Sequence, residues 1–452
     1  MANLNISSKQ HRIVEMTEFA KSAALYERAQ KVMPGGCSRN TILRKPHPVY
    51  ADKGEGCFVT DIEGVKRIDF ANNVASLIHG HAYGPIVEGV KNQLDNGSAF
   101  SVGTEIEVKY AEQLVARNPG FERLRFVNSG TEAVMSCLKA ARAYTGRAKI
   151  AKVEGSYHGL YDYAEVSQTS KPANWGDVDA PSSVPVAQGT PQSALDDVVV
   201  IPFNDPDRAI AILDQHKDTI AGVLLDLLPH RIGVIPASDA FVKALREWTT
   251  TNGALLIFDE VITFRAEFSG AQQAYDVSPD LTALGKMIGG GFPVGGLAGR
   301  ADVLEVMNPL NGPAPFPHYG TFSANPITLT AGSIAMFHFN EAAVVKLNTL
   351  ADKARAGIAE AIKLADVPAC VTGRGSMFRI HLKEAEPTTY RNAFITPDKQ
   401  KCVSALLDHF FNNGLIMIET CSGLLSTPMT QSEIDQLSQV TLDGLRKIKP
   451  ML

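Results

Sequence analysis

The sequence predicts an α/β protein, with a large domain around a mostly parallel sheet and a second, smaller α+β domain. Three observations support this fold class. The chain has 452 residues, more than a single compact core usually organises. Between about residue 105 and residue 261, short apolar runs alternate with helical patterns, as in a sheet that helices cover on both faces. After about residue 330, one long amphipathic helix and shorter stretches of mixed type follow.

The overall composition is ordinary for a globular enzyme, with 45% hydrophobic and 20% charged residues. A net charge of -5 gives no basic footprint for nucleic acid, and no uncharged apolar stretch is long enough to cross a membrane. The start, MANLNISSKQHR, lacks the apolar core of a signal peptide, which favours the cytoplasm. Six scattered cysteines without a CxxC pair predict neither a metal site nor a disulfide framework.

The amino-terminal part combines a helix with short extended pieces. Helical spacing covers residues 17–33, with Thr17 as the expected N-cap and Pro34-Gly35-Gly36 as the stop. The stretch PVYADKGEGCFVTDIEGVKRIDF then predicts a small antiparallel meander. Its turns are expected at Lys53-Gly54 and Glu63-Gly64.

The middle of the chain alternates predicted helices and strands. Helices are expected at 85–94, 107–118 and 130–146, and strands at 123–127, 149–153, 198–203, 222–228 and 254–261. Residues 165–197 interrupt this pattern, because they are rich in Ser, Pro, Gly and Asp. A loop of this length is typical of a lid or an active-site wall.

The last part predicts a small α+β domain. Its elements are expected at 341–366 (helix), 370–382 (strand-like), 399–412 (helix), 414–418 (strand) and 431–447 (helix). We therefore divide the chain into an N-terminal segment that packs with the small domain, a large domain, and the small domain itself, at residues 1–75, 76–330 and 331–452.

Two charged residues indicate the chemistry. Asp259 ends a predicted buried strand, where open α/β sheets place ligands. Lys286 lies in the apolar, glycine-rich stretch ALGKMIGGG, where an amine that loses its hydration becomes nucleophilic. Taken singly, they are more simply a strand-end acid and a surface lysine. Together they suggest a Schiff-base lysine and an acid that holds a pyridinium nitrogen, the pair expected of a pyridoxal 5'-phosphate (PLP) enzyme.

A phosphate site is predicted where a strand meets a helix, at Ser129, Gly130 and Thr131. The glycine permits close approach, and the hydroxyls lie at a helix N-terminus, where free N–H groups and the dipole favour an anion. A simple helix cap is the alternative interpretation. Neither Gly285-Lys286-Met287 nor Gly373-Arg374-Gly375 fits a P-loop or a dinucleotide fingerprint, which disfavours a hydride-transfer enzyme.

Two further motifs are candidates for the same site. Ser156-Tyr157-His158-Gly159 follows a predicted strand, where an aromatic ring can cover a flat cofactor or simply fill the core. Thr321, in a second Gly-Thr element, could offer another hydroxyl to a phosphate, although turns commonly use these residue types.

The stretches FVNSGTEA, SYHG, IFDEV, LGKMIGGG and GTFSANP, in this order and spacing, resemble the class III aminotransferases among the fold-type I PLP enzymes. The resemblance runs from about Lys31 to the C-terminus. It implies a mostly parallel seven-stranded sheet in the large domain, with PLP as cofactor. It also implies an amino donor and a keto acid as small-molecule partners, and a homodimer with active sites at the subunit interface.

The resemblance assigns roles by position. Lys286 is similar to the Schiff-base lysine and Asp259 to the partner of the pyridine nitrogen, whereas Tyr157 and Val261 match the residues on the two ring faces. The other predicted cofactor contacts are His158 beside Tyr157 and, around the phosphate, Ser129, Gly130, Thr131 and, from the neighbouring subunit, Thr321.

Two subgroups are most similar, the glutamate-1-semialdehyde aminomutases and the β-phenylalanine-type β-amino acid aminotransferases. The 165–197 segment sits where aminomutases carry a gating loop, but Cys421-Ser422-Gly423 replaces their Glu-Ala-Gly motif. Arg39, in PGGCSR, is similar to a carboxylate-binding arginine of the β-amino acid group. The second, C-terminal arginine of that group has no counterpart near Cys421.

The stretch LLDLLPHRIG departs from the Glu-Pro of the family, with Asp226 in place of the glutamate. His230 and Arg231 would face the substrate side, where Arg231 could hold a carboxylate, although an incidental surface loop is an equal alternative. We predict a PLP aminotransferase that favours a β-amino acid. A 2,1-aminomutase or an amino-acid epimerase on the same scaffold are the alternatives, and the presence of Lys286 and Asp259 argues against a non-catalytic homologue.

Overall fold

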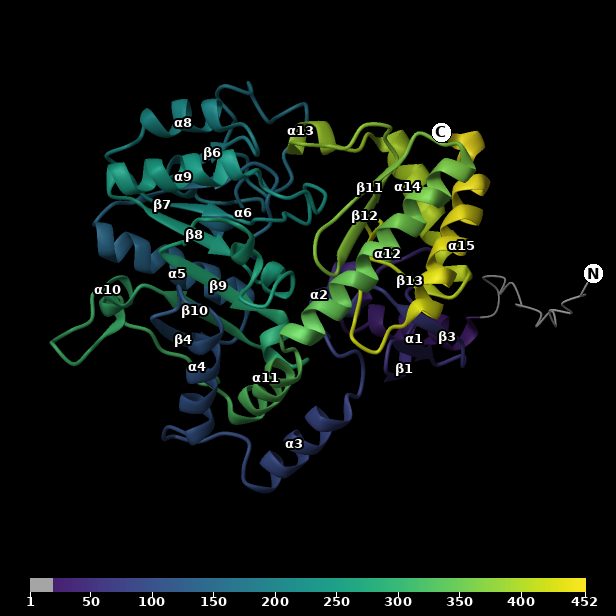
Figure 1. The fold of residues 1–452 in the computed structure, drawn as a ribbon, viewed down its shortest axis with the longest axis horizontal. Coiled ribbons are helices and arrows are strands. Elements are labelled where there is room, and N and C mark those ends of the chain that lie inside the picture. The colour runs from purple at the N-terminus through teal and green to yellow at the C-terminus, as the bar shows by residue number, and fades with distance from the viewer. Residues whose placement is uncertain (1–18) are drawn as a thin grey trace, which may run out of the picture.

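The computed structural model describes residues 19–452 and contains a central seven-stranded sheet (Figure 1). The strand order is β4-β10-β9-β8-β7-β5-β6, and only β10 is antiparallel to its neighbours. The strands are β4 (Arg123–Val127), β5 (Lys149–Val153), β6 (Val198–Ile201), β7 (Ile220–Leu225), β8 (Leu255–Asp259), β9 (Leu281–Gly285) and β10 (Gly295–Gly299). The predicted seven-stranded, mostly parallel sheet is confirmed.

Helices cover both faces of this sheet. Successive residues of β5 point to opposite sides, so Ile150 packs with α5 and Ala151 with the cluster that includes α8 and α9. The helices of this part are α3 (Gly84–Asp95), α4 (Glu105–Arg117), α5 (Gly130–Thr145), α6 (Asp162–Glu165), α7 (Gln192–Asp196), α8 (Pro206–Asp214), α9 (Asp239–Asn252), α10 (Ala301–Leu304) and α11 (Pro326–His338). The predicted helices at 85–94, 107–118 and 130–146 are confirmed as α3, α4 and α5.

The strands β9 and β10 were not predicted from the sequence. The sequence of β10 is GGLAG, which contains none of the β-branched or aromatic residues that are typical of strands. Its first glycine has a structural reason, because a Cβ on Gly295 would lie 2.1 Å from the carbonyl oxygen of Ser129. The glycines of β10 therefore record a close approach between this strand and the predicted phosphate turn.

The predicted amino-terminal meander is present, with one error. β1 (Ala51–Glu55), β2 (Phe58–Asp61) and β3 (Lys66–Asp69) are antiparallel neighbours. The turn expected at Lys53-Gly54 was wrong, since both residues lie within β1 and the chain reverses at Gly56-Cys57. Gly54 serves packing instead, because a Cβ there would lie 2.5 Å from the His81 ring.

Other expectations for this part hold in the described residues. The turn at Glu63-Gly64 is confirmed by the hydrogen bond from the Gly64 N–H to the Asp61 carbonyl (2.8 Å). The helix predicted at 17–33 is α1 (Ala20–Gln30), and Pro34–Gly36 forms a 3-10 turn after it. The expected N-cap, Thr17, lies outside the described residues.

The amino-terminal segment and the last part of the chain share a second sheet of order β1-β2-β3-β13. In this sheet β13 (Leu415–Ile416) runs parallel to β3. The remaining elements of this side are α12 (Glu341–Ala365), β11 (Cys370–Thr372), β12 (Met377–His381), α13 (Tyr390–Ala393), α14 (Pro397–Asn412), β14 (Ser422–Leu424) and α15 (Gln431–Ile448). Helices and strands were predicted at most of these positions, and α13 and β14 were missed. The domain boundaries after residues 75 and 330 stay a prediction.

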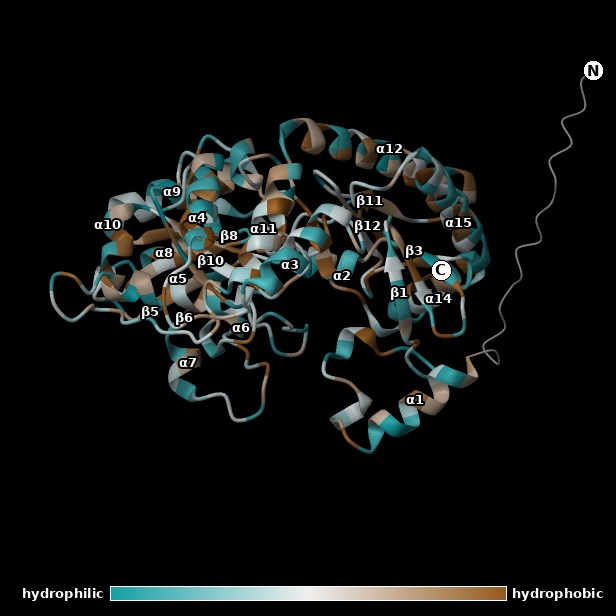
Figure 2. Ribbon diagram, turned by 90° about the horizontal axis from the view of Figure 1, so that it is seen from below, coloured by the Kyte–Doolittle hydropathy of each residue, from teal (hydrophilic) through white to brown (hydrophobic). Residues whose placement is uncertain are grey.

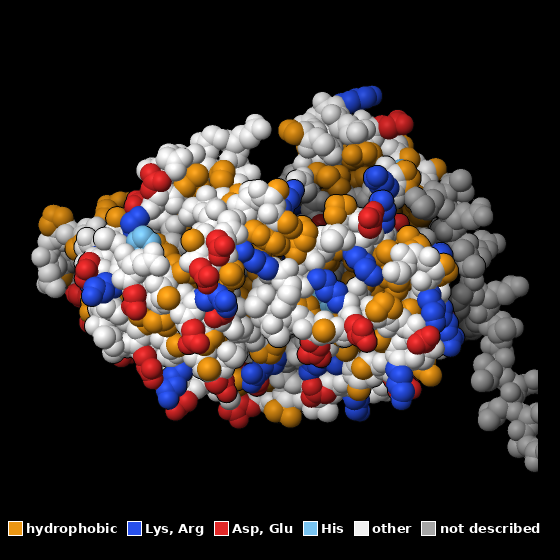
Figure 3. All heavy atoms as spheres, turned by 90° about the horizontal axis from the view of Figure 1, so that it is seen from above, with side chains coloured by type: hydrophobic (Ala, Val, Ile, Leu, Met, Phe, Trp, Pro, Cys, Tyr) orange, Lys and Arg blue, Asp and Glu red, His pale blue; other side chains and the backbone are white. Residues whose placement is uncertain are grey.

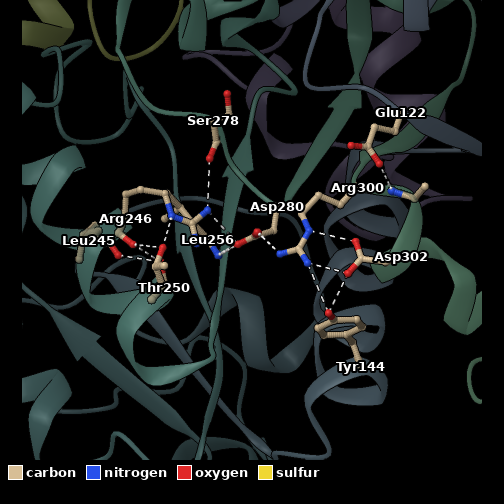
Figure 4. A network of polar contacts seen from close by, with 12 residues as sticks. Glu122, Tyr144, Leu245, Arg246, Thr250, Leu256, Ser278, Asp280, Arg300 and Asp302 are labelled. Atoms are coloured by element: carbon tan, nitrogen blue, oxygen red, sulfur yellow. Dashed lines mark hydrogen bonds and ion pairs between the residues drawn. The ribbon is translucent and has the colours of Figure 1, made fainter.

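A buried carboxylate anchors the start of β9 (Figure 4). Asp280 accepts hydrogen bonds from the Leu256 N–H (2.7 Å) and from Arg300 Nη1 (2.7 Å), and it pairs with Arg246 Nη1 (3.0 Å). Because β9 leads directly to Lys286, this network fixes the strand that presents the lysine. Among the described residues, no helix is long and apolar enough to cross a membrane.

Candidate active site

The lysine singled out from the sequence lies directly after β9. Lys286 has a φ of 51°, a left-handed conformation that is uncommon for a residue with a side chain and often marks a functional site. Its amine makes no hydrogen bond to a described residue. Burial lowers the pKa of Lys286 below its ordinary value, although Asp259 and Asp226 oppose the shift. The amine is therefore closer to its neutral, nucleophilic form than a surface lysine is.

Asp259 lies at the carboxyl end of β8 with 5% of its surface exposed. Its Oδ1 accepts a hydrogen bond from the Val261 N–H (3.0 Å), and its Oδ2 lies 2.7 Å from His158 Nδ1. Burial lowers the pKa of His158, so the ring is neutral at neutral pH and Nδ1 carries the proton that it donates to Asp259. Its other nitrogen, Nε2, is buried without a partner among the described residues. A carboxylate with lone pairs to spare is thus held in a fixed orientation.

The predicted phosphate turn begins α5. Ser129 is its N-cap, and its Oγ accepts a hydrogen bond from the Glu132 N–H (3.1 Å), which confirms the capping interpretation for this hydroxyl. The N–H groups of Gly130 and Thr131 remain without a partner among the described residues. A Cβ on Gly130 would lie 2.7 Å from Val261 Cγ1, so only glycine fits here. The helix end can both be capped and bind an anion.

Val261 and Tyr157 are the candidates for the two ring faces. Val261 is buried against Gly130 and Gly285, and a Cβ on Gly285 would lie 3.1 Å from it. Tyr157 is 38% exposed, and the Arg231 guanidinium lies 5.2 Å from the centre of its ring. The site thus has an apolar wall on one side and an accessible aromatic ring on the other.

Asp226 adds a second buried carboxyl beside Asp259. It follows β7, and the pairing of Leu225 with Phe258 makes the two acids neighbours at the same sheet edge. Burial and the charge of Asp259 raise the pKa of Asp226 well above its ordinary value. Two adjacent carboxylates cannot both ionise cheaply, so the neutral form of Asp226 is favoured. Of the departing LLDLLPHRIG stretch, the structure places Asp226 near Lys286 and Arg231 near Tyr157.

The arginine proposed for substrate binding lies on the amino-terminal segment. Arg39 is exposed, and its Nη1 donates a hydrogen bond to Asn73 Oδ1 (2.6 Å). Asn73 belongs to α2 (Asn72–Ala75), a turn in which all four residues are left-handed, with φ between 46° and 74°. This conformation costs about 1–2 kcal/mol for each residue with a side chain. Sequence analysis missed Asn73, for which only the tolerance of Asn for this conformation is a signal.

Thr321 lies in the loop before α11 and is exposed. The same loop contacts the residue before the phosphate turn of its own chain, because Asn128 Nδ2 donates to Ser323 Oγ (3.5 Å). Thr321 itself makes no hydrogen bond to a described residue, so its predicted contact with a neighbouring subunit stays a prediction.

A second buried lysine, Lys152 on β5, was also missed. Its Nζ donates to the carbonyl oxygen of Ser156 (3.0 Å) and to that of Val166. Burial lowers the pKa of Lys152 to about 7, with Arg231 acting in the same direction. The second lysine of the run KIAKV, which lies between Ala151 and Val153, is the signal that could have revealed it.

Two parts of the molecule project to the same side and leave a hollow between them. In Figure 2, α1 and the loops around α6 and α7 project to the same side, and Figure 3 shows the surface hollowed between two such protrusions. Arg39 comes from the part that carries α1, and Tyr157 precedes α6. Residues from both parts are therefore available to a ligand that enters here.

Comparison with known proteins identifies relatives of the whole chain. The family model described as aminotransferase class-III matches residues 42–443. Glutamate-1-semialdehyde 2,1-aminomutase 2 of Bacillus licheniformis is 37% identical over 382 residues, which cover 84% of this chain and 86% of that protein.

Solved structures give the same result. An omega-transaminase from Sphaerobacter thermophilus is 45% identical with a TM-score of 0.92, covering 94% of this chain and 97% of that one. A transaminase with PLP bound is 39% identical with a TM-score of 0.88, covering 96% and 98%. A β-phenylalanine aminotransferase from Variovorax paradoxus is 30% identical with a TM-score of 0.86, covering 96% and 95%.

Proposed function

The chain belongs to the class III aminotransferase family, and we propose that it moves the amino group of a β-amino acid to a keto acid. It is a PLP-dependent enzyme of fold type I, as the match over most of the chain and the PLP-containing neighbour indicate. The observation that carries the proposal is a partly buried amine with a lowered pKa, Lys286, near a fixed carboxylate, Asp259.

The residues present fit PLP. The N–H groups of Gly130 and Thr131 at the start of α5 suit a phosphate, and Val261 offers an apolar surface to a ring. Asp259 retains free lone pairs for a protonated ring nitrogen, and His158 Nε2 is a buried polar atom that still lacks a partner among the described residues. When bound, PLP supplies an aldehyde that takes up the amino group and a pyridinium that withdraws electrons.

The residues then have distinct tasks. Asp259, oriented by His158, would hold a proton on the pyridine nitrogen. Lys286 Nζ is the amine that would hold the cofactor covalently, and once free it would carry a proton to and from the reacting carbon. Burial and the charge of Asp259 favour the neutral form of Asp226, which would add no second negative charge next to the amine. Tyr157 would cover the ring face opposite Val261 and exclude water.

A carboxylate on the substrate would bind Arg39. The Asn73 Oδ1 atom orients this guanidinium through a single hydrogen bond and leaves its other donors free for a carboxylate. The likeness to a β-phenylalanine aminotransferase supports a β-amino acid as donor. Arg231 is the second candidate, because it lies over the Tyr157 ring.

The test compares a β-amino acid with its decarboxylated amine as donors. A hydrogen bond to a charged group contributes about 1.5–3 kcal/mol, so Arg39→Ala should lower kcat/KM for the amino acid by about 10- to 100-fold. The amine should be nearly unaffected. An equal loss for both donors would show that Arg39 is structural, and Arg231→Ala would then be examined in the same way.

An aminomutase is the second candidate, because the relative from Bacillus licheniformis carries that name. An aminomutase converts glutamate-1-semialdehyde without any added keto acid, whereas an aminotransferase stops after one half-reaction. Turnover of that substrate in the absence of a keto acid would favour the aminomutase.

We also propose a homodimer. Large apolar side chains are exposed on two loops, which an Asn325 Nδ2 hydrogen bond to the Ser98 carbonyl joins (2.9 Å). Their exposed fractions are Phe100 49%, Val102 75%, Leu310 86%, Tyr319 90% and Phe322 61%. Such patches are typical of interfaces. Sedimentation should give a dimer, and an active, PLP-saturated monomer would contradict the proposal, together with the predicted role of Thr321 across the interface.

The cytoplasm is the proposed location. All six cysteines lie within the described residues and are free thiols, as is usual in a reducing compartment. Cell fractionation tests this point directly.

A further inference from the structure

A buried ion pair borders the cofactor site and joins it to a distant part of the chain. Glu154, three residues before Tyr157, is 1% exposed. Its carboxylate accepts hydrogen bonds from Arg391 Nε (2.8 Å) and Nη2 (3.2 Å). Arg391 lies on α13, between β12 and α14, and Figure 1 shows this short helix at the edge of the small domain that is nearest the large domain.

Arg391 also holds the segment that the sequence suggested as a lid or wall. Its guanidinium donates to the carbonyl oxygens of Trp175 (2.9 Å), Gly176 (2.9 Å) and Asp177 (3.2 Å), and it lies 4.9 Å from the centre of the Trp175 ring. A guanidinium has five N–H donors in a fixed plane, which a lysine cannot reproduce. One side chain therefore binds both the start of the Tyr157 loop and this segment.

The neighbouring Tyr390 touches the same two places. Its hydroxyl donates to the Ser170 carbonyl (2.6 Å). Its ring occupies the space beside Gly155, where a Cβ would lie 2.0 Å from the tyrosine Cδ2. Gly155 has a φ of 77°, so both its backbone conformation and the tyrosine ring require a glycine.

The short helix α13 is itself rigid. The Thr389 side chain accepts a hydrogen bond from the Asn392 N–H, and the Asn392 side chain accepts one from the Thr389 N–H. Such a capping box satisfies two backbone N–H groups that are otherwise free at the start of a helix. Arg391 and Tyr390 are therefore presented in a fixed arrangement, without the ordering cost of a flexible loop.

We propose that Tyr390 and Arg391 are positioning residues that hold the Tyr157 loop and residues 170–177 against the cofactor site. The proposal rests on the proposed function, in which Tyr157 covers one face of PLP. Separation of α13 from the large domain would remove the charged partner of Glu154 and leave this carboxylate with the Ser170 Oγ hydrogen bond (3.3 Å), which is unfavourable for a buried charge. The contact is therefore either made or broken, and the position of the small domain determines whether the ring face is closed.

The chain offers a reporter for this contact. It contains two tryptophans, of which Trp248 is 5% exposed and bound to Asp214 far from α13. Trp248→Phe leaves Trp175, under the Arg391 guanidinium, as the sole source of tryptophan fluorescence. In this background, acrylamide quenching of the holoenzyme measures how well Trp175 is shielded, and equilibrium dialysis measures the affinity for PLP.

Arg391→Met, which keeps the apolar stem and removes the guanidinium, should increase the quenching of Trp175. It should weaken PLP binding by about tenfold, the scale of one charged hydrogen bond. Arg391→Lys should restore little of the Trp175 shielding or of the PLP affinity. A lysine cannot make the planar set of hydrogen bonds that the guanidinium makes to Glu154 and to the carbonyls of residues 175–177. The pair Glu154→Gln with Arg391→Met should recover thermal stability, since no buried charge is left alone, while Trp175 stays quenchable.

Arg355→Met is the matched control. Arg355 is 16% exposed and Arg391 is 19% exposed. Arg355 pairs with Asp352 and donates to the carbonyls of Gly375 (2.9 Å) and Met377 (2.8 Å), all on the small-domain side. Its loss should lower stability without changing Trp175 quenching or PLP affinity.

If Arg391→Met and Arg355→Met give the same quenching and the same PLP affinity, α13 has no positioning role. Tyr157→Ala separates this outcome from a failure of the proposed function. Unchanged PLP affinity in Tyr157→Ala would refute the ring-cover role of Tyr157, whereas the Trp175 signal reports on the α13 contact in either case.

Discussion

The two ends of the central sheet use the same residue types in opposite ways. At the amino end of β9, Asp280 is 3% exposed, and two arginines and a backbone N–H bind its carboxylate. At the carboxyl end, Asp259 and Asp226 are each 5% exposed. Asp226 accepts one hydrogen bond among the described residues, from the Leu228 N–H (2.9 Å). Burial is therefore the same at both ends, and the supply of partners is what distinguishes them.

The difference teaches how a site is recognised. A buried polar group without a full set of partners is costly, and at the carboxyl end His158 Nε2 is buried without a partner among the described residues. Close to it, the partly buried Lys286 amine makes no hydrogen bond to a described residue, and Asp226 accepts one. At the amino end, no buried side-chain polar atom of Asp280, Arg246 or Arg300 lacks a partner within residues 19–452. The free bonding capacity at the carboxyl end is what PLP and substrate would complete, and the closed network at the amino end holds the strands in place.

The largest effect is expected from Lys286→Ala. This variant loses the amine that would hold PLP covalently, so transamination and borohydride-reducible cofactor should both disappear. The protein should stay folded, because the lysine makes no hydrogen bond to a described residue. Circular dichroism checks the fold, and reduction with borohydride checks the covalent cofactor. If the variant retained covalent cofactor, Lys286 would not be the Schiff-base lysine.

Asp259→Asn should have the next largest effect. The amide keeps the shape but cannot stabilise a charged ring nitrogen, so about 3 kcal/mol of transition-state stabilisation should be lost, or about 100-fold in kcat. The measurement is single-turnover kinetics with saturating PLP. Turnover near that of the unmodified enzyme would mean that the carboxylate has a structural task like that of Asp280.

Asp280→Asn sharpens the comparison from the other end. The arginines at this end are partly exposed, with 22% and 39% of their side chains accessible. We therefore expect a loss of about 2 kcal/mol in the free energy of unfolding. The rate per correctly loaded active site should not change. Urea unfolding measures the stability, and active-site titration allows the rate to be given per loaded site. An unchanged stability with a lowered kcat would show that Asp280 serves catalysis and would contradict its structural role.

The smallest effect concerns pH. The neutral amine of Lys286 is the reactive form, and burial lowers its pKa. The rate of covalent PLP uptake by the apo-protein should therefore rise with pH and level off at a lower pH than for a blocked free lysine. The same midpoint for both amines would show that burial does not activate Lys286.

Much of the fold could be predicted because local patterns carried it. The helix α5 has apolar residues at helical spacing and ends at Gly146, which is left-handed. The strand β8 is a continuous apolar run before Asp259. β10 was missed because its glycines serve close packing, and the turn at Lys53-Gly54 was misplaced because Gly54 makes room for His81. A glycine in a sequence does not reveal whether the chain turns or something approaches it.

For the site, the sequence revealed the candidate chemical residues and missed the side chains that contact and position their neighbours. Lys286 and Asp259 stand out by residue type and by their place at strand ends. The contact of Asn73 with Arg39 and that of Arg391 with Glu154 join positions that are 34 and 237 residues apart, so no local pattern marks them. Lys152 is the exception, because a lysine within an apolar strand is visible in the sequence.

The central claim, that the groups at the carboxyl end are arranged for PLP, can be tested with one measurement. The holoenzyme is reduced with borohydride, digested, and searched by mass spectrometry for the lysine that carries the phosphopyridoxyl group. Lys152 provides an internal alternative, because it is also buried and has a pKa lowered to about 7. The account predicts the label on Lys286 alone. A label on Lys152, or spread over surface lysines, would contradict it.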